Sequence, residues 1–257
     1  MSLSQLRPLS FGETLDGAFT LYRRHFTAFV VTGLLAYAPV IAVALVDAAG
    51  LLSPQASMLL DRVTGLLAAI LAFGALTRLA SDAYLGEEVS VGAAFRAAGS
   101  RFRPVWASLT LQGLAVGLGL LLLVVPGVIA FIVLFAMVPV VVLEGKNSSD
   151  AQGRSRELAR GAWKRVLGTI GTFTLITWVP VLGTAIAVAM IATAVAPGAS
   201  EGVTGGVVAV TIYLVRAAAL PVQVIGAVLL YYDRRVRTEA LDLALPTAAE
   251  APVPAFA

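Results

Sequence analysis

One arginine lies inside a long apolar stretch of this chain, and its position suggests a site more strongly than that of any other residue. Arg216 stands in VTIYLVRAAALPVQ, near the middle of that stretch. An arginine at the centre of a bilayer costs at least about 2.5–3.5 kcal/mol, so Arg216 should face a bundle interior, a partner or water. We interpret it as a candidate intramembrane polar site for an anion or a lipid headgroup. The alternative is a structural arginine that snorkels outward or pairs with Asp61 or Asp47.

Two acidic residues border other apolar stretches. Glu144 closes the run FAMVPVVVLEG, and a basic segment follows it directly. If that segment folds back as a helix, Arg154 and its neighbours come within reach of Glu144, and a structural ion pair results. Asp233 lies beside Arg234 in YYDRRVR, where a boundary anchor is the first interpretation and a site the second.

Enzyme chemistry has few residues to draw on. The chain has no cysteine and one histidine, His25, which excludes thiol nucleophiles, cysteine-ligated metals and histidine clusters. No phosphate loop, His-Glu-x-x-His or Gly-x-Ser-x-Gly motif is present, and no apolar stretch holds two carboxylates. We therefore predict no catalytic residue, no cofactor, no metal ion and no nucleic-acid partner.

The composition places these residues in a membrane protein. Of the 257 residues 59% are hydrophobic and 13% charged, against about 45–50% and 25% in soluble domains. The apolar residues gather into runs of about 20, the length that crosses a hydrocarbon core of about 30 Å. The polar first 25 residues contain no apolar core of a signal peptide, so we expect the first span to direct insertion.

Six such runs predict an all-α polytopic membrane helical bundle. Pro126-Gly127 divides a stretch of nearly 40 uncharged residues into two spans joined by a tight hairpin. The predicted spans are 26–48, 59–80, 105–125, 127–143, 166–195 and 204–231, within a single membrane domain of residues 1–244. Residues 245–257 are rich in proline and alanine and are predicted to be disordered.

Amphipathic helices are predicted beside the spans, at residues 10–25, 90–103 and 150–163. Ser10 can cap the first, and Ser148-Ser149-Asp150 can cap the third. Each precedes a pair of spans, which suggests three copies of an interfacial helix followed by a hairpin. Chance similarity among membrane-boundary segments is the alternative.

The basic residues predict the orientation. All 18 Lys and Arg residues except Arg62 and Arg216 lie at or beyond the span ends on one side, with Arg78 near the end of span 59–80. The positive-inside rule then places both termini in the cytoplasm, and we expect a multi-pass protein of the bacterial inner membrane. A basic collar also attracts anionic lipid, unless it reflects only the ordinary charge bias. The candidate lipid contacts are Arg154, Arg156, Lys164, Arg165 and Arg234.

Several motifs together resemble the glycerophosphoryl diester phosphodiesterase membrane-domain family. They are LDGAFTLYRRHF, LLLVVPGVIAFIVLFAMVPVVVLEG, RSRELARGAWKRVLG and YYDRRVRTEALDL, spread over residues 9–243. The matching positions are Pro126, Gly127, Pro139, Glu144, Ser155, Arg160, Trp163, Tyr232, Asp233 and Arg235. The resemblance implies a stand-alone membrane region without a phosphodiesterase, because a catalytic barrel needs about 250 residues of its own.

The sequence therefore favours a non-catalytic membrane module that binds lipid or a partner protein in the membrane or cytoplasm, or scaffolds an assembly. The alternative is a transporter or channel-like protein for a lipid, an amphiphile or an anion. That alternative predicts a cavity that reaches Arg216 between proline-kinked spans. A membrane enzyme is a third hypothesis, and it lacks a visible acid–base pair.

Overall fold

The computed structural model describes residues 7–195, 198 and 201–239, and these residues form helices without strands. Along the chain the helices are α1 Phe11–Arg24, α2 Phe26–Ala48, α3 Pro54–Leu85, α4 Val91–Ser100, α5 Phe102–Leu122, α6 Val124–Val133, α7 Met137–Leu143, α8 Ser148–Ala159, α9 Trp163–Val195 and α10 Glu201–Glu239. Within the described residues, six stretches are long and apolar enough to cross a membrane, counting α6 and α7 as one. The predicted all-α polytopic membrane bundle is confirmed.

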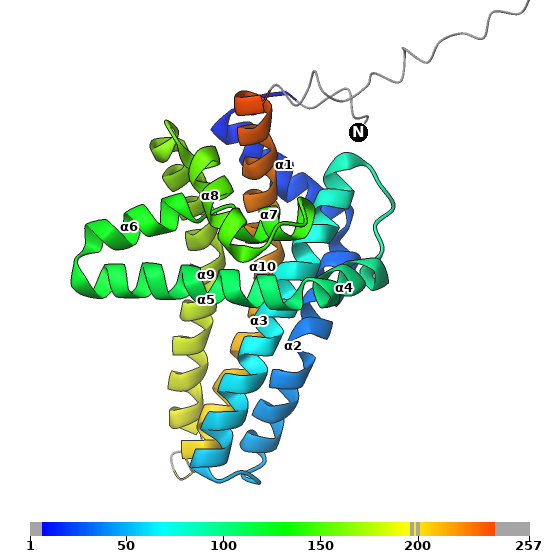
Figure 1. Cartoon of the computed structure of the whole chain (residues 1–257). Helices are drawn as coiled ribbons and strands as arrows, with labels where there is room; N and C mark the ends of the chain where they lie inside the picture. The colour runs from blue at the N-terminus through cyan, green and yellow to red at the C-terminus, as the bar shows by residue number, and fades with distance from the viewer. Residues whose placement is uncertain (1–6, 196–197, 199–200, 240–257) are drawn as a thin grey trace, which may run out of the picture.

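Four helices, α2, α3, α9 and α10, run side by side as a bundle (Figure 1). Small residues let them approach closely, as is common where helices pack in membranes. A Cβ atom on Gly33 of α2 would lie 2.2 Å from the carbonyl oxygen of Ala217 on α10. Helix α10 lies at the centre and contacts α2, α3 and α9.

One end of the bundle carries the short helices. Helices α1 and α8 lie there together with the C-terminal end of α10 (Figure 1). We call it the basic end; the loop between α2 and α3 lies at the opposite end, the far end. Helix α10 continues to Glu239, whereas the predicted span stops at 231, so the YYDRRVR sequence is helical.

The helices α5 and α6 form a hairpin that runs across the bundle rather than along it (Figure 1). The turn was predicted at Pro126-Gly127 but falls at Leu123, whose backbone is extended with φ −159° and ψ 141°. Pro126 instead stands in the first turn of α6, where a missing N–H costs nothing. Gly127 packs against α5, and a Cβ atom there would lie 2.6 Å from the backbone nitrogen of Leu120.

The predicted span 127–143 is broken into α6 and α7. Residues 134–136 between them are not helical. The Ser155 hydroxyl of α8 stabilises the break, because it donates to the carbonyl of Val133 at 2.7 Å and accepts from the amide of Ala136 at 3.1 Å. Pro139 stands in the first turn of α7 and does not kink a longer helix.

The three short helices lie close to their predicted ranges. Ser10 caps α1 in a capping box with Glu13. The N-cap of α8 is Asn147, one residue before the predicted Ser148-Ser149-Asp150. The predicted span 166–195 lies within α9, which continues through Pro180 as one helix. A short helix precedes two long ones in α1–α3 and in α8–α10, whereas in the middle α4 precedes the long α5 and the short α6 and α7. The threefold repeat stays a prediction. The predicted disordered tail, 245–257, lies outside the described residues.

Candidate functional site

A groove runs between α6 and α8 beside the start of α9, and we call it the α6–α8 groove. Its volume is about 880 Å³, within the range of small-molecule sites. Its lining is Ala115, Pro126, Ile129, Ala130, Ile132, Val133, Leu134, Gln152, Arg156, Ala159, Arg160 and Trp163. The floor from α6 is wholly apolar, and the two arginines come from the α8 side. An apolar floor beside a cationic rim suits an amphiphile with a negative head.

The rim arginines have no internal partner. Arg156 and Arg160 are exposed, and neither side chain makes a hydrogen bond or an ion pair with any residue in the described ranges. They lie four residues apart, so they lie on the same face of the helix. Beside them Trp163 is 56% exposed, and the Lys164 ammonium lies 5.4 Å from the centre of its ring. The rim therefore offers unpaired positive charge next to an exposed aromatic ring.

Arg154, on the same helix, is instead fully engaged. It forms ion pairs with Glu144 at 3.2 Å, with Glu157 at 3.5 Å and with Glu239 of α10. The predicted pair between Glu144 and Arg154 is thus present. The ion pairs of Arg154 therefore hold α8 to the bundle. Arg156 and Arg160 are left to line the groove.

Glu144 is the centre of this anchor. It accepts from the Tyr231 hydroxyl at 2.9 Å and pairs with Lys146 at 3.2 Å as well as with Arg154. Burial raises the pKa of Glu144, but the hydrogen bonds from Tyr231 and Lys146 and the charge of Arg154 outweigh it and hold the pKa below its usual value. The carboxylate therefore stays ionised in the folded protein.

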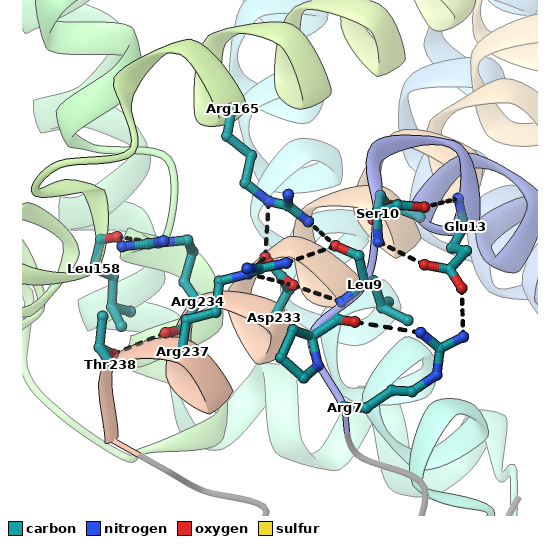
Figure 2. Close-up of polar contacts among 12 residues, drawn as sticks. Arg7, Leu9, Ser10, Glu13, Leu158, Arg165, Asp233, Arg234, Arg237 and Thr238 are labelled. Carbon is teal, nitrogen blue, oxygen red and sulfur yellow. Dashed lines mark hydrogen bonds and ion pairs between the residues drawn. The ribbon is translucent and has the colours of Figure 1, made fainter.

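Asp233 is a second anchor, drawn in Figure 2. Its side chain is fully buried and accepts from the Leu9 amide at 2.8 Å, from Arg165 at 2.9 Å and from Arg237 at 3.0 Å. Arg165 and Arg237 also donate to the carbonyl of Leu9. One carboxylate thus joins the segment before α1 to the start of α9 and the end of α10.

Arg234 closes the C-terminal end of α8. Its guanidinium donates to the carbonyl of Leu158 at 2.7 Å (Figure 2). It also donates to the carbonyl of Arg160 at 3.2 Å. These carbonyls have no partner within α8, and a cation is favourable at a helix C-terminus. The Arg160 side chain is not needed for capping and stays on the rim.

The predicted lipid contacts therefore divide into two groups. Arg154, Arg165 and Arg234 are held by intramolecular bonds, whereas Arg156 and Lys164 are exposed. Among the family-like positions, Pro126, Arg160 and Trp163 line the groove. Four others hold helices together: Glu144, Ser155 and Asp233 as above, and Tyr232, which bonds to Ser81 of α3 at 2.7 Å. Arg235 bonds to Tyr231 and Glu239 within α10.

Arg216 is paired with neither Asp61 nor Asp47. Its guanidinium lies over two rings, 4.9 Å from the centre of Trp178 on α9 and 5.6 Å from that of Tyr37 on α2. Asp61 instead accepts from the Tyr213 hydroxyl at 2.6 Å. Cation–π contacts of this kind stabilise a charge away from water. Arg216 is thus held within the described bundle by aromatic faces.

A second cavity, of about 380 Å³, lies where the α5–α6 hairpin crosses the bundle. Its lining includes Gln112 of α5, Phe131 of α6, Trp178 of α9 and Gln223 of α10. The cavity touches Trp178 but not Arg216. The path to Arg216 that the transporter hypothesis predicts is therefore not formed by this cavity.

Comparison of the chain with protein-family models, with curated proteins and with solved structures gives no match. Within the described residues no group of three or more His, Cys, Asp or Glu side chains could hold a metal ion. Sequence reasoning did not foresee Ile129, Ala130 and Gln152 as site residues. They become a site only because the break after Val133 turns α6 so that it faces α8.

Proposed function

We propose that the protein is a non-catalytic membrane module that binds an anionic phospholipid in the α6–α8 groove. The observation that carries the proposal is the pair of unpaired arginines, Arg156 and Arg160, on the rim of an apolar groove of about 880 Å³. A lipid phosphate would lie against the two guanidinium groups, which suit phosphate geometry. An acyl chain would lie along the apolar floor from α6.

The location of the groove supports a phospholipid as the ligand. It lies at the basic end of the bundle, where helices of membrane length end and α8 begins (Figure 1). Trp163 on the rim suits the headgroup level of a membrane, where tryptophan is enriched. The distribution of Lys and Arg supports a cytoplasmic orientation of this end, with both termini on the cytoplasmic side of a bacterial inner membrane. We include this orientation in the proposal.

The resemblance to the glycerophosphoryl diester phosphodiesterase membrane-domain family supports the same interpretation. Three positions that carry it, Pro126, Arg160 and Trp163, line the groove, although none of their side chains makes a hydrogen bond or an ion pair to another helix in the described part of the chain. Membership of that family remains part of the proposal. A non-catalytic role accords with a groove rim that holds arginines and no carboxylate.

The test is native mass spectrometry of the purified protein titrated with phosphatidylglycerol or phosphatidylcholine. We expect one tightly retained phosphatidylglycerol and weak retention of phosphatidylcholine. In Arg156→Gln/Arg160→Gln, the loss of about 1 kcal/mol for each basic residue near the surface should weaken phosphatidylglycerol binding roughly 30-fold. Ala130→Trp should weaken both lipids, because the indole fills the floor of the groove.

The control is Arg96→Gln/Arg103→Gln. It removes the same charge from two exposed arginines of α4 and α5 that do not line the groove. An equal loss of phosphatidylglycerol binding in the two double variants would mean that basic residues attract the lipid in general. That result would overturn the proposal that the lipid binds in the groove. Displacement of the lipid by millimolar inorganic phosphate would mean a site for phosphate alone, without the acyl chain.

A further inference from the structure

The orientation of the α5–α6 hairpin relative to the bundle indicates where the membrane surface lies. Gly74 of α3 marks the level of the crossing, because a Cβ atom there would lie 3.0 Å from Ala98 of α4 and 4.0 Å from Val105 of α5. Gly74 lies about 20 residues after Pro54, the first residue of α3, which is about 30 Å along the helix. The hairpin thus meets the bundle about one hydrocarbon thickness from the far end.

Helix α10 gives the same level independently. The cavity under the hairpin is lined by Gln223 and Val224 of α10. Gln223 lies about 22 residues after Glu201, which is about 33 Å along α10. Two helices that start at the far end therefore agree on the level of the crossing.

The outer part of the hairpin leaves the bundle and is not covered by any residue that the structure describes. Leu121 is 82% exposed and Leu122 is 76% exposed, and the neighbouring residues through Val125 are at least 66% exposed. The sequence from Pro104 to Leu143 contains no charged residue. Such an apolar tip is not stable in water, and at this level the adjoining phase is the boundary of the bilayer.

We infer that the α5–α6 hairpin lies in the plane of the membrane within the cytoplasmic leaflet, with its tip covered by lipid acyl chains. Four helices, α2, α3, α9 and α10, then cross the bilayer. The charge pattern permits this, since a hairpin that begins and ends on one side keeps both flanks there whether or not it crosses. That this leaflet is the cytoplasmic one rests on the orientation given with the proposed function. The position of the hairpin in the membrane plane does not depend on that orientation.

The test compares membrane depth at two positions of one helix. Leu114 and Leu122 of α5 are both exposed and lie eight residues apart, about 12 Å along the helix. Because the chain has no cysteine, Leu114→Cys and Leu122→Cys can each carry a single fluorophore. In vesicles of phosphatidylglycerol and phosphatidylcholine, quenching by lipids spin-labelled at different depths then reports the depth of each position.

Leu182→Cys and Met190→Cys are the matched control. They are exposed positions of α9, also eight residues apart, on a helix that runs along the bundle. We expect the same depth for the two α5 positions and depths that differ by about 12 Å for the α9 pair. A depth difference in α5 equal to that in α9 would mean that the hairpin crosses the bilayer and would overturn the inference.

A second readout separates lipid from protein as the cover of the tip. Leu122→Cys should be quenched by lipid as strongly as Met190→Cys. Protection of Leu122→Cys from lipid quenching, together with disulfide-linked dimers of that variant, would mean that a second copy covers the tip and would also overturn the inference. Labelling with an impermeant maleimide identifies the leaflet. Leu51→Cys in the α2–α3 loop and Glu88→Cys before α4 lie on opposite sides of the membrane, so the reagent, added from one side, reacts with only one of them. Failure of the groove experiment would leave these depths unchanged.

Discussion

The Ser155 hydroxyl donates to the carbonyl of Val133 at 2.7 Å, and this bond joins α8 to the last residue of α6. The same oxygen accepts from the amide of Ala136 at 3.1 Å. Ser155 thus provides partners for backbone groups that the break between α6 and α7 leaves free. It also sets the distance between the apolar and the basic wall of the α6–α8 groove.

Ser155→Ala should destabilise the protein and loosen the groove. Leaving a buried backbone group without a partner costs about 1–3 kcal/mol, and Ser155 is fully buried. We expect a lower Tm and weaker retention of phosphatidylglycerol. Ser149→Ala, at an exposed position of the same helix, should stay within about 0.5 kcal/mol of the parent. Equal Tm values for both variants would contradict this role.

Asp233→Asn should be the most damaging substitution at the basic end. The neutral side chain leaves Arg165 and Arg237 without their shared carboxylate, and breaking a buried ion pair costs about 3–5 kcal/mol. We expect a large fall in Tm and faster proteolysis before α1, since Arg165 and Arg237, which donate to the carbonyl of Leu9, lose the charge that positions them. Asp16→Asn, which removes an exposed carboxylate from α1, should change neither.

Glu144 should make stability depend on pH in the acid range. Its folded pKa is depressed, so its contribution is fully present above the unfolded value of about 4.3. It is lost as the pH falls through the lower folded value. Tm measured from pH 7 to pH 3 should therefore fall less steeply below about pH 4 in Glu144→Gln than in the parent. Parallel curves for the two proteins would show that Glu144 is not the titrating group.

Gly33→Ala should separate α2 from α10. The new Cβ atom would lie 2.2 Å from the carbonyl oxygen of Ala217, which is backbone and cannot move aside cheaply. Gly113→Ala on α5 meets nothing within 4 Å and should stabilise its helix by about 0.5–1 kcal/mol. Thermal unfolding of the two variants should therefore shift in opposite directions.

Arg216→Met should be tolerated if the arginine is structural. No described carboxylate pairs with it, so no buried charge is left behind, and an apolar side chain suits the span. We expect an equal or higher Tm and unchanged phosphatidylglycerol retention. Loss of lipid binding in Arg216→Met would mean that the lipid binds at Arg216, near the middle of the membrane, and would favour the transporter hypothesis. Arg216→Glu, which places a carboxylate against the faces of Tyr37 and Trp178, should lower Tm.

The sequence by itself determined the helices and the basic end. Apolar runs of about 20 residues located the long helices and indicated a membrane protein, since that length is what a bilayer crossing needs. Local capping chemistry located the start of α1, because Ser10 and Glu13 lie three residues apart in the chain. The pair between Glu144 and Arg154 was also foreseen, because the two residues are close in sequence.

Only the tertiary structure decided the direction of the α5–α6 hairpin, the break after Val133 and the surroundings of Arg216. Each depends on residues far apart in the chain, such as Arg216 with Tyr37 and Trp178. Hydrophobic periodicity indicates how apolar a helix is and which of its faces is buried. It does not indicate which other helix that helix crosses, or at which residue of its partner. A hairpin in the membrane plane and one across it have the same apolar length and the same charged flanks. Packing against α3, α8 and α9 sets the direction in which the hairpin crosses the bundle.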